Sequence, residues 1–427
     1  MNDFKQLINA YNRFVPYKLI DLLGKGSIYD VKLGDQVEKI ITILFSDIRD
    51  FTALSEALTP QENFNFINSY LSQIEPLITL NNGIVDKFIG DAIMAIFPIS
   101  ADDAFTCAVQ ILDQLKNYNE GRKRAGYSPI KIGIGLNTGI AMIGTVGGYN
   151  RMDGTVISDA VNLSSRIESL TKNYKVPFLI SENTYHSINK SNRLYTRFID
   201  RVLVKGKNRP HSIYEVFAVE NEESKGKKLK NKEVFEEALA NYHYKNIHVA
   251  QKQLQEYIKI NPTDNPAGVY LQRCENYSRN GIHEGAYELT EKIYWDKSYL
   301  INHEVIDDQH RELVEASIRL IGMIRDKQDI EKIIEAMHGL EKKAKEHFHT
   351  EEKLMQEKSY PFLKQQKEMH NNFLSSFMWL KRLIEDGKLN HVYMMFRVQI
   401  FLIDWLVNHT KKEDKHFGKY LIMVEEM

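Results

Sequence analysis

Two aspartates in the first quarter of the chain stand where apolar strand patterns stop. Asp47 follows the apolar run ITILFS, and Asp91 follows Gly90 in a tight turn between the apolar runs of DKFIGDAIMAIF. Carboxylate oxygens are the ligands that magnesium and manganese prefer. Two such carboxylates could share metal ions that activate a hydroxyl group and neutralise phosphate oxygens. Either aspartate alone would more simply be a turn former.

A second pair lies in the helical pattern of TVISDAVNLSSRIES. Asn162 and Arg166 are four residues apart, so they point to one face of that helix. An arginine fork pairs well with phosphate oxygens and can stabilise negative charge that develops in a transition state. An isolated pair of this kind is usually a solvated helix face.

The last third of the chain holds nine of the fourteen histidines. Histidines and carboxylates recur there at i, i+4 and i, i+5 in separate helical patterns, so they could converge inside a four-helix bundle. Histidine with bridging carboxylates suits iron. The candidate ligands are His310, His347, Glu351, His370, His409 and Asp414.

The elements that position these groups divide the chain into four parts. Short β-rich runs alternate with helical patterns in the first half, which predicts a mixed α/β domain. A charged tract, ENEESKGKKLKNK, marks a boundary, as a solvated linker or a helix start. Two helical patterns separated by NPTDNP follow and resemble one tetratricopeptide-like unit, which must pack on a neighbour to bury its apolar face. The predicted parts are a helical lead-in (1–37), the α/β domain (38–219), a linker and helical connector (220–289) and a helical bundle (290–427).

Composition narrows the functional classes. The 427 residues carry 56 basic and 57 acidic side chains, so no long-range field favours a nucleic acid polymer or a membrane surface. Two distant cysteines argue against a secreted disulfide scaffold, and we expect a cytoplasmic protein. The most apolar late stretch is interrupted by Arg397, Gln399 and Asp404, so we expect no membrane insertion.

Read together and in order, the motifs around Asp47, Asp91, IGIGLNTGIAMIGTVGG and Asn162 resemble class III adenylate and guanylate cyclases over roughly residues 12–218. The resemblance implies that Asp47, Asp91 and the carbonyl of Ile48 bind two Mg²⁺ or Mn²⁺ ions per active site. It also implies that Asn162 orients the ribose and that Arg166 stabilises the phosphate. The metal aspartates and the base and ribose contacts come from different protomers in this family, which implies a homodimer.

The resemblance also bears on the nucleotide. Lys87 stands where adenylate cyclases have lysine and guanylate cyclases glutamate, and Thr155 matches the threonine subgroup of adenylate cyclases. Both favour ATP, because a threonine hydroxyl can accept a hydrogen bond from the adenine amino group. Lys205 matches a lysine that contacts the triphosphate, although a surface lysine is an equally good interpretation. Asp50 and Ser158 depart from the family by replacing common glycines, so we expect a different backbone shape at these two positions.

Residues 293–427 resemble hemerythrin, including YWDKSYL and the YPFL before the third helix. The resemblance implies that Glu351 and Asp414 bridge two irons per chain, that His310 and His347 complete the oxygen-binding iron, and that His370 and His409 serve the other. Gln366 stands where the family has a further histidine ligand. The affected iron could take the glutamine oxygen or water, or stay under-coordinated, which puts its redox potential in doubt.

The predicted fold is multidomain: an α+β class III cyclase domain with a ferredoxin-like core, an α-hairpin connector and an all-α four-helix hemerythrin-like bundle. The predicted function is an adenylate cyclase that converts ATP to 3',5'-cyclic AMP and diphosphate and is regulated by O₂, NO or redox state at a non-heme di-iron site. One alternative is a constitutive cyclase beside an independent oxygen- or iron-binding bundle. Another is a degenerate cyclase domain used as a dimerising module, against which the four intact catalytic residues argue.

Overall fold

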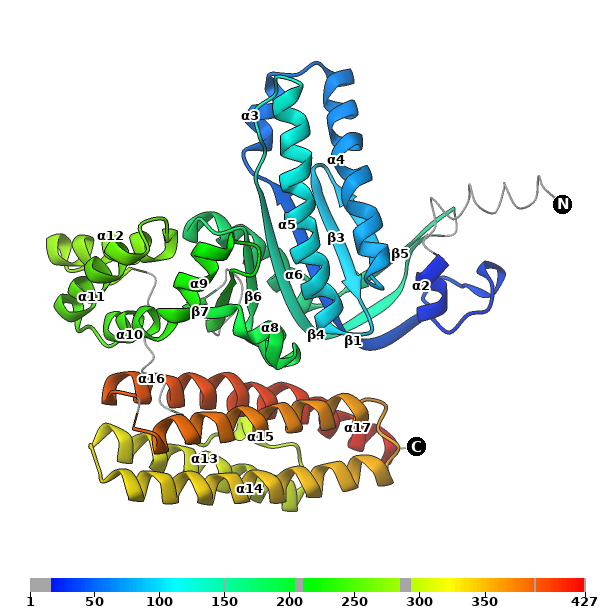
Figure 1. Cartoon of the computed structure of the whole chain (residues 1–427). Coiled ribbons are helices and arrows are strands. Elements are labelled where there is room, and N and C mark those ends of the chain that lie inside the picture. The colour runs from blue at the N-terminus through cyan, green and yellow to red at the C-terminus, as the bar shows by residue number, and fades with distance from the viewer. Residues whose placement is uncertain (1–16, 149, 204–209, 285–292, 388, 426–427) are drawn as a thin grey trace. The chain divides into compact units, whose positions relative to one another are not determined.

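The computed structural model describes residues 17–148, 150–203, 210–284, 293–387 and 389–425 (Figure 1). The chain forms two compact units. The first comprises the residues up to Phe198 together with Ile213–Leu229, and the second comprises Ile199–Ser212 together with Lys230 to the end of the chain.

The chain contains an eight-stranded sheet, most of whose strands belong to the first unit. Its path is β2-β3-β1-β4-β6-β8-β7, with β5 paired to β4 off this path. The long central strand β1 pairs antiparallel with β3 and β4, while β4 and β6 are parallel. The strands are β1 (Gln36–Ile48), β2 (Ile84–Ile89), β3 (Ala92–Phe97), β4 (Ile132–Gly148), β5 (Arg151–Ile157), β6 (Phe178–Ser181), β7 (Thr196–Leu203) and β8 (Pro210–Val216).

Helices cover this sheet and begin at recognisable caps. The helix α4 starts with a capping box in which Thr59 and Glu62 satisfy each other's backbone amides, and Pro60 occupies the first turn. In Figure 1, α4 and α5 run side by side along the sheet. The helices of this unit are α2 (Tyr17–Leu22), α3 (Phe51–Glu56), α4 (Pro60–Leu80), α5 (Ala101–Arg124), α6 (Asp159–Tyr174), α7 (Glu182–Ser187), α8 (Lys190–Leu194) and α9 (Glu222–Lys230), with a 3₁₀ turn at Ile28–Asp30.

The helix α6 packs unusually close to strand β4. A Cβ atom added at Gly135 would lie 2.3 Å from the backbone nitrogen of Glu168 and 2.6 Å from the carbonyl oxygen of Ser164. The glycines of the IGIGLN run therefore let the helix approach the strand backbone. The apolar side chains of β1 and the start of α6 share one core cluster, which includes Ile41, Ile43 and Ala160.

The connector in the second unit contains three helices, where the sequence pattern had predicted two. These are α10 (Lys232–His243), α11 (Ile247–Ile260) and α12 (Asn265–Asn280). The first predicted helix breaks near Lys245, which adopts a left-handed backbone with φ of 62° and reverses the chain. Lysine is not a residue that typically ends a helix, so the apolar periodicity on both sides of it predicted one continuous helix. The charged tract before the connector forms α9 (Glu222–Lys230), as the helix-start alternative predicted.

The bundle packs its helices around one apolar core that includes Leu320, Met337, Phe377 and Val398. In Figure 1 its long helices run side by side. They are α13 (Glu304–Arg325), α14 (Ile330–Glu357), α15 (Leu363–Glu385), α16 (His391–Leu402) and α17 (Lys415–Glu425), preceded by a 3₁₀ turn at Lys297–Tyr299.

Between α16 and α17 the chain forms two π-helical segments, Ile403–Val407 and His409–Asp414. Residues five apart stack in a π-helix, whereas in an α-helix they diverge. The i, i+5 spacing of His409 and Asp414 therefore places both on one face. A π-helical turn inside an α-helix frequently marks a functional site.

The connector contacts the bundle through buried polar groups. Glu236 of α10 accepts hydrogen bonds from the Tyr393 hydroxyl at 2.6 Å and from Arg397 at 2.8 Å, both on α16. Tyr244 donates to the side chain of Gln399 at 2.8 Å. These contacts give the short connector the packing partner that it needs.

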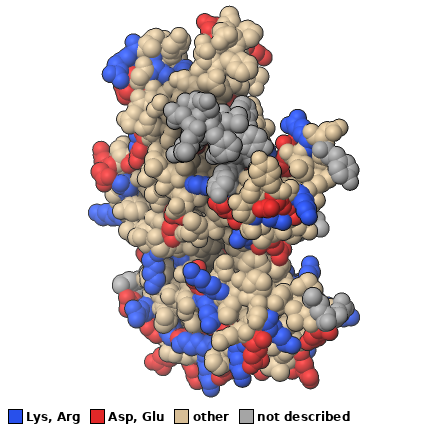
Figure 2. Space-filling model, turned by 90° about the vertical axis from the view of Figure 1, so that its right-hand side faces the viewer, with Lys and Arg blue, Asp and Glu red and all other residues tan. Residues whose placement is uncertain are grey.

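Basic and acidic side chains are interspersed on the face seen in Figure 2, as the near-zero net charge predicts. No helix in the described part of the chain combines the length and apolar character that crossing a bilayer requires.

Candidate functional site

The two metal-candidate aspartates meet at one edge of the sheet. Asp47 is the penultimate residue of β1, and Asp91 sits in the two-residue turn between β2 and β3, after Gly90 with φ of 66°. Burial, and then the neighbouring Asp47, raise the pKa of Asp91 to about 7. Two carboxylates this close repel each other unless a proton or a cation lies between them, so the pair fits a divalent metal ion.

Ile48 has a fixed backbone orientation at the same edge. Its amide donates to the Asp91 carboxylate at 3.2 Å, while the amide of Arg49 donates to the carbonyl of Lys131 on the opposite side at 2.8 Å. Because the peptide between Ile48 and Arg49 is planar and trans, the Ile48 carbonyl points away from Lys131 and toward the Asp91 side. This carbonyl is therefore available to the same cation.

Lys87 and Thr155, which are 68 residues apart, are brought together by β2 and β5. The Lys87 ammonium donates to the Thr155 hydroxyl at 2.7 Å and lies 3.2 Å from the Asp86 carboxylate. The side chain of Asp86 is only 1% exposed, and burial raises its pKa. Sequence reasoning missed Asp86, because an aspartate inside a strand pattern carries no distinguishing motif.

Asn162 and Arg166 lie on successive turns of α6, where Asn162 is exposed and Arg166 is partly exposed. Within the described residues, neither side chain makes a hydrogen bond or ion pair, so both are free to bind a ligand or a second protomer. Ser158 caps this helix, since its hydroxyl accepts from the amide of Val161 at 3.2 Å. Lys205 lies outside the described residues.

Asp50 adopts the backbone conformation for which the family uses glycine. Its φ of 55° and ψ of 31° are left-handed, and it directly precedes α3. Aspartate tolerates this region better than most residues. With aspartate in place of glycine, the backbone still forms the turn after Asp47. Only the free-energy cost of the left-handed conformation differs.

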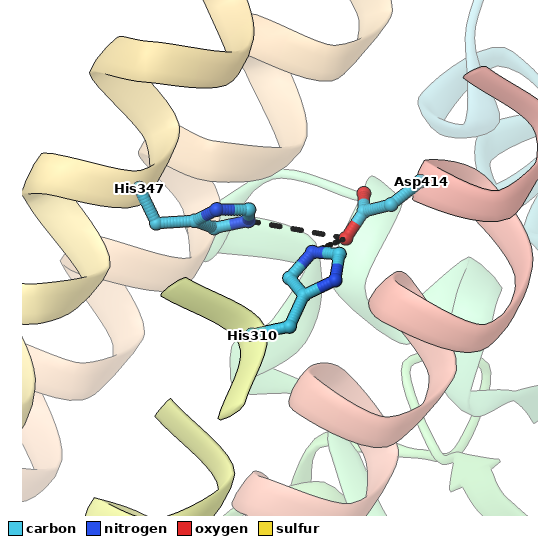
Figure 3. A group of neighbouring side chains, drawn as sticks. All are labelled: His310, His347 and Asp414. Atoms are coloured by element: carbon cyan, nitrogen blue, oxygen red, sulfur yellow. Dashed lines mark ion pairs between the residues drawn. The ribbon is translucent and has the colours of Figure 1, made fainter. Parts of the chain in front are cut away.

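In the bundle, His310, His347 and Asp414 come together from α13, α14 and the π-helical turn (Figure 3). The Nε2 atom of His310 lies 3.1 Å from Oδ2 of Asp414, and Nε2 of His347 lies 3.9 Å from the same oxygen. All three side chains are buried. Burial lowers the pKa of His347 to about 3, so its imidazole is neutral and keeps a lone pair for a metal.

Glu351, His370 and His409 form a second buried group. Nε2 of His370 lies 3.3 Å from Oε2 of Glu351 and 3.1 Å from Nε2 of His409. Asp414 spans both groups, because its Oδ1 lies 3.0 Å from His409 while its Oδ2 faces His310. Glu351 also spans them, with its Oε2 3.9 Å from Nε2 of His347. Both carboxylates thus have the placement of bridging ligands.

Many polar atoms in this cluster lack hydrogen bonds to any described residue although they lie close together. They belong to His310, His347, Glu351, Gln366 and Asp414. A buried polar atom without a hydrogen-bond partner destabilises the folded state. Converging lone pairs with no donor between them are the arrangement expected of ligands that bind a cation. Gln366 is 1% exposed and lies one helical turn before His370, so its amide oxygen is available to the second group.

Several supporting residues were not found from the sequence. Nδ1 of His310 donates to the carbonyl of Tyr299 at 2.9 Å, and Nδ1 of His370 contacts the Glu352 carboxylate at 2.7 Å. Such bonds fix the tautomer that leaves Nε2 free for a metal. The ring of Phe348 stacks on His370 at 4.0 Å, and Trp405 stacks on His409 at 4.5 Å. Glu352 is adjacent to Glu351 in a charged run of sequence. Only the helix geometry distinguishes Glu351, a candidate metal ligand, from Glu352, which contacts His370.

Comparisons with known proteins agree with this division. Residues 34–218 match the family described as adenylate and guanylate cyclase catalytic domain, and residues 302–421 match the hemerythrin HHE cation binding domain. The terminal-differentiation specific adenylate cyclase of Dictyostelium discoideum is 38% identical over 276 residues, which are 63% of this chain and 13% of that protein. The adenylate cyclase of Anabaena cylindrica is 40% identical over 223 residues, 51% of this chain and 44% of that protein.

The chain spans less than half the length of either of these two relatives. Among solved structures, a bacterial light-regulated adenylyl cyclase is 26% identical over 51% of this chain and 62% of that chain, with a TM-score of 0.45. The family matches confirm both resemblances and the predicted fold class: the chain carries a class III cyclase catalytic domain followed by a hemerythrin domain. The threonine subgroup and the tetratricopeptide-like character of the connector stay predictions.

Proposed function

We propose that the chain is an adenylate cyclase that converts ATP to 3',5'-cyclic AMP and diphosphate. The observation that carries the proposal is the meeting of Asp47, Asp91 and the Ile48 carbonyl at one sheet edge, in a domain that also brings Lys87 to Thr155. The two relatives described above, from Dictyostelium discoideum and Anabaena cylindrica, are named adenylate cyclases, which agrees with the choice of ATP.

The reaction joins the ribose 3'-oxygen to the α-phosphorus and breaks the bond from that phosphorus to diphosphate, while the hydroxyl proton leaves to solvent. Two Mg²⁺ or Mn²⁺ ions at Asp47, Asp91 and Ile48 would supply the charge that acidifies the hydroxyl and neutralises phosphate oxygens. Arg166 pairs with the α-phosphate as charge develops, and Asn162 orients the ribose. Lys205 would contact the triphosphate.

We further propose a homodimer in which each active site combines two protomers. Asn162 and Arg166 face outward and make no bond within the described residues, which is expected of groups that act on a ligand held by a partner. Mixing Asp47→Asn chains with Arg166→Ala chains tests this directly. Half of the mixed dimers would be heterodimers with one intact site of two, so roughly a quarter of wild-type turnover should return. Inactive mixtures would rule out the shared site.

The base contacts support ATP over GTP. Thr155 accepts a hydrogen bond from Lys87 and, as a hydroxyl, has a second lone pair that can accept from the adenine amino group. Asp86 holds the Lys87 ammonium in place. Incubation of purified protein with manganese and each nucleotide, with the product identified by chromatography, tests both activity and preference. Absence of cyclic AMP from the wild-type protein would refute the proposed activity.

For the bundle we propose a non-heme di-iron site with two irons per chain. Glu351 and Asp414 would bridge, His310 and His347 would hold the iron that binds O₂ or NO, and His370, His409 and Gln366 would hold the other. The bound irons would supply reversible diatomic binding and redox change. The protein's part is to orient the imidazoles and fix their tautomers, through Tyr299 and Glu352, and to pack Phe348 and Trp405 against them.

We also propose that the iron state regulates the cyclase. Trp405 stacks on His409, and the adjacent Asp404 accepts a 2.7 Å hydrogen bond from Ser212 between two buried side chains. Ser212 belongs to β8, where the next residue, Ile213, pairs with Ser181. A change at the irons thus has a mechanical route into a strand of the cyclase sheet.

The route continues within the sheet. The Ser181 hydroxyl donates to Asn137 at 2.7 Å, and the Asn137 amide donates to the Ala160 carbonyl of α6 at 3.0 Å. The helix α6 carries Asn162 and Arg166. This unbroken series of contacts from Asp404 to α6 favours regulation of the cyclase by the bundle. An independent oxygen- or iron-binding bundle would need no buried polar contact with the sheet. A cytoplasmic location stays a prediction.

A further inference from the structure

The turn that follows Asp47 is tied to the helix α6 by Arg49, a residue that no catalytic role requires. The Arg49 guanidinium donates to the Thr171 hydroxyl at 2.7 Å and to the Val176 carbonyl at 3.1 Å. Thr171 in turn donates to the carbonyl of Glu168. Arg49 therefore joins the end of β1 to the last turn of α6, across more than 120 residues of sequence.

The sheet makes room for this contact with a glycine. Gly133 pairs with Asp47 in the β1–β4 ladder. A Cβ atom there would lie 2.4 Å from both Oε1 of Glu168 and Oγ1 of Thr171, and 3.3 Å from the Arg49 guanidinium. The side chains of Glu168 and Thr171 from α6, and that of Arg49 from the turn after β1, thus fill the space directly above Gly133. Any side chain at position 133 would displace them.

Three carboxylates act electrostatically on the Arg49 guanidinium. Burial lowers the pKa of Arg49, while the carboxylates of Glu168, Asp50 and Asp47 favour its charged form. Burial, followed by the charge of Asp47, raises the pKa of Glu168 to about 7, and Arg49 opposes that rise. The guanidinium thus lies among carboxylates from both sides of the contact, where it offsets their mutual repulsion.

We infer that Arg49 is a positioning residue that holds Asp47 and the Ile48 carbonyl at the geometry a divalent cation needs, in fixed register with α6. The inference rests on the proposed cyclase function. Because α6 also presents Asn162 and Arg166, the same contact sets the spacing between the metal half of the site and the ribose and phosphate half on each protomer. Both hydrogen bonds come from the same terminal guanidinium nitrogen, Nη2, at the end of the longer and planar arginine side chain. A lysine ammonium is a shorter point charge and should not hold both acceptors in the same geometry.

The test is Arg49→Lys in the full chain with the bundle loaded with iron. Binding of Mn²⁺ is measured from the EPR signal of the free ion, with 3'-deoxy-ATP present because it lacks the attacking hydroxyl. We expect Mn²⁺ affinity to fall about 10-fold, as for loss of a group that orients a metal ligand. We expect kcat to fall on the order of 10- to 100-fold, with a smaller change in KM for ATP. Arg124→Lys, on the exposed end of α5, is the matched control and should match wild type.

Thr171→Val gives a second, gentler variant that removes one acceptor and keeps the side-chain shape. It should lower Mn²⁺ affinity in the same direction, and the double variant should be no worse than Arg49→Lys alone, because both break one contact. A lower melting temperature with wild-type Mn²⁺ affinity and kcat in both variants would reduce Arg49 to a structural contact and overturn the inference. A different result would separate the two proposals. If the variants bind Mn²⁺ more weakly than wild type, but wild type itself makes no cyclic AMP, the positioning role stands and the proposed activity is refuted.

Discussion

The two candidate sites of this chain are built in opposite ways. The cyclase groups lie at a sheet edge and on a helix face, and Lys87, Asn162 and Arg166 keep part of their side chains in solvent. The bundle groups come from four helical segments and are almost completely buried. A site that must admit and release a substrate has to stay open to solvent, whereas a site that keeps its metal can be closed. The open site depends on how its side chains are positioned relative to the substrate, and the closed site depends on a metal that satisfies its buried ligand atoms.

The first prediction separates the two regions most strongly. Asp47→Asn or Asp91→Asn should each lower turnover more than about 100-fold, because an amide is a poor ligand for a hard cation. The iron content and the visible spectrum of the bundle should not change, since no bundle ligand is touched. Asp113→Asn, on the exposed face of α5, serves as the control. If either variant kept half of the wild-type rate, the assignment of Asp47 and Asp91 as ligands of the catalytic metals would be wrong.

The second prediction reverses the pattern. His347→Ala should lose most of the bound iron while the protein keeps dimeric turnover, because a buried ligand cannot be replaced by a neighbour. Iron removal from wild type should lower the melting temperature of the bundle, since the carboxylates of Glu351 and Asp414 are left without a cation. His338→Ala, exposed on the same helix, should behave as wild type. Retained iron in His347→Ala would disprove the proposed ligand set.

The third prediction sharpens the account of the open site. Lys87→Glu reverses the charge that bonds Thr155 and faces Asp86, so it should weaken the use of ATP more than that of GTP. A mismatched hydrogen bond costs about 1–3 kcal/mol, which corresponds to roughly 5- to 150-fold in the ratio of kcat/KM values. Comparable use of both nucleotides by wild type would show that this contact does not select the base.

The smallest expected effect concerns the turn after Asp47. Asp50→Gly removes the left-handed strain but adds freedom to the unfolded chain and loses the exposed 3.2 Å pair with Lys172. The free energy of unfolding should change by less than about 1 kcal/mol, as followed by urea denaturation. Asp50→Val, which cannot adopt this backbone easily, should cost about 1–2 kcal/mol. Equal stability of the two variants would argue against the left-handed turn.

The sequence predicted residues that carry chemistry more fully than the residues that support them. The candidate site residues Asp47, Asp91, Lys87 and Thr155 could be proposed because their motifs are ordered along the chain. The supporting contacts of Asp404 with Ser212 and of Glu236 with Arg397 join residues 192 and 161 positions apart, and no local pattern encodes them.

Two local features also escaped prediction. The break between α10 and α11 falls at Lys245, which looks helical in sequence, and the π-helical turn that aligns His409 with Asp414 has no composition of its own. Both are set by packing within the second unit rather than by propensity. Arg49 was visible in FSDIRDFT, but its partners Thr171 and Val176 are fixed only by the approach of α6 to the glycines of β4.

The central claim is that the closed site controls the open one, and a single assay tests it. ATP turnover of the purified full chain is compared with the iron site apo, di-ferrous and oxidised, for wild type and for Ser212→Ala. The account predicts that wild-type turnover differs between iron states by about fivefold or more, the lower end of ordinary allosteric coupling. It also predicts that Ser212→Ala, which loses the bond to Asp404, keeps turnover but narrows that difference. Equal wild-type turnover in all three iron states would contradict the claim and leave the bundle as an independent iron-binding domain.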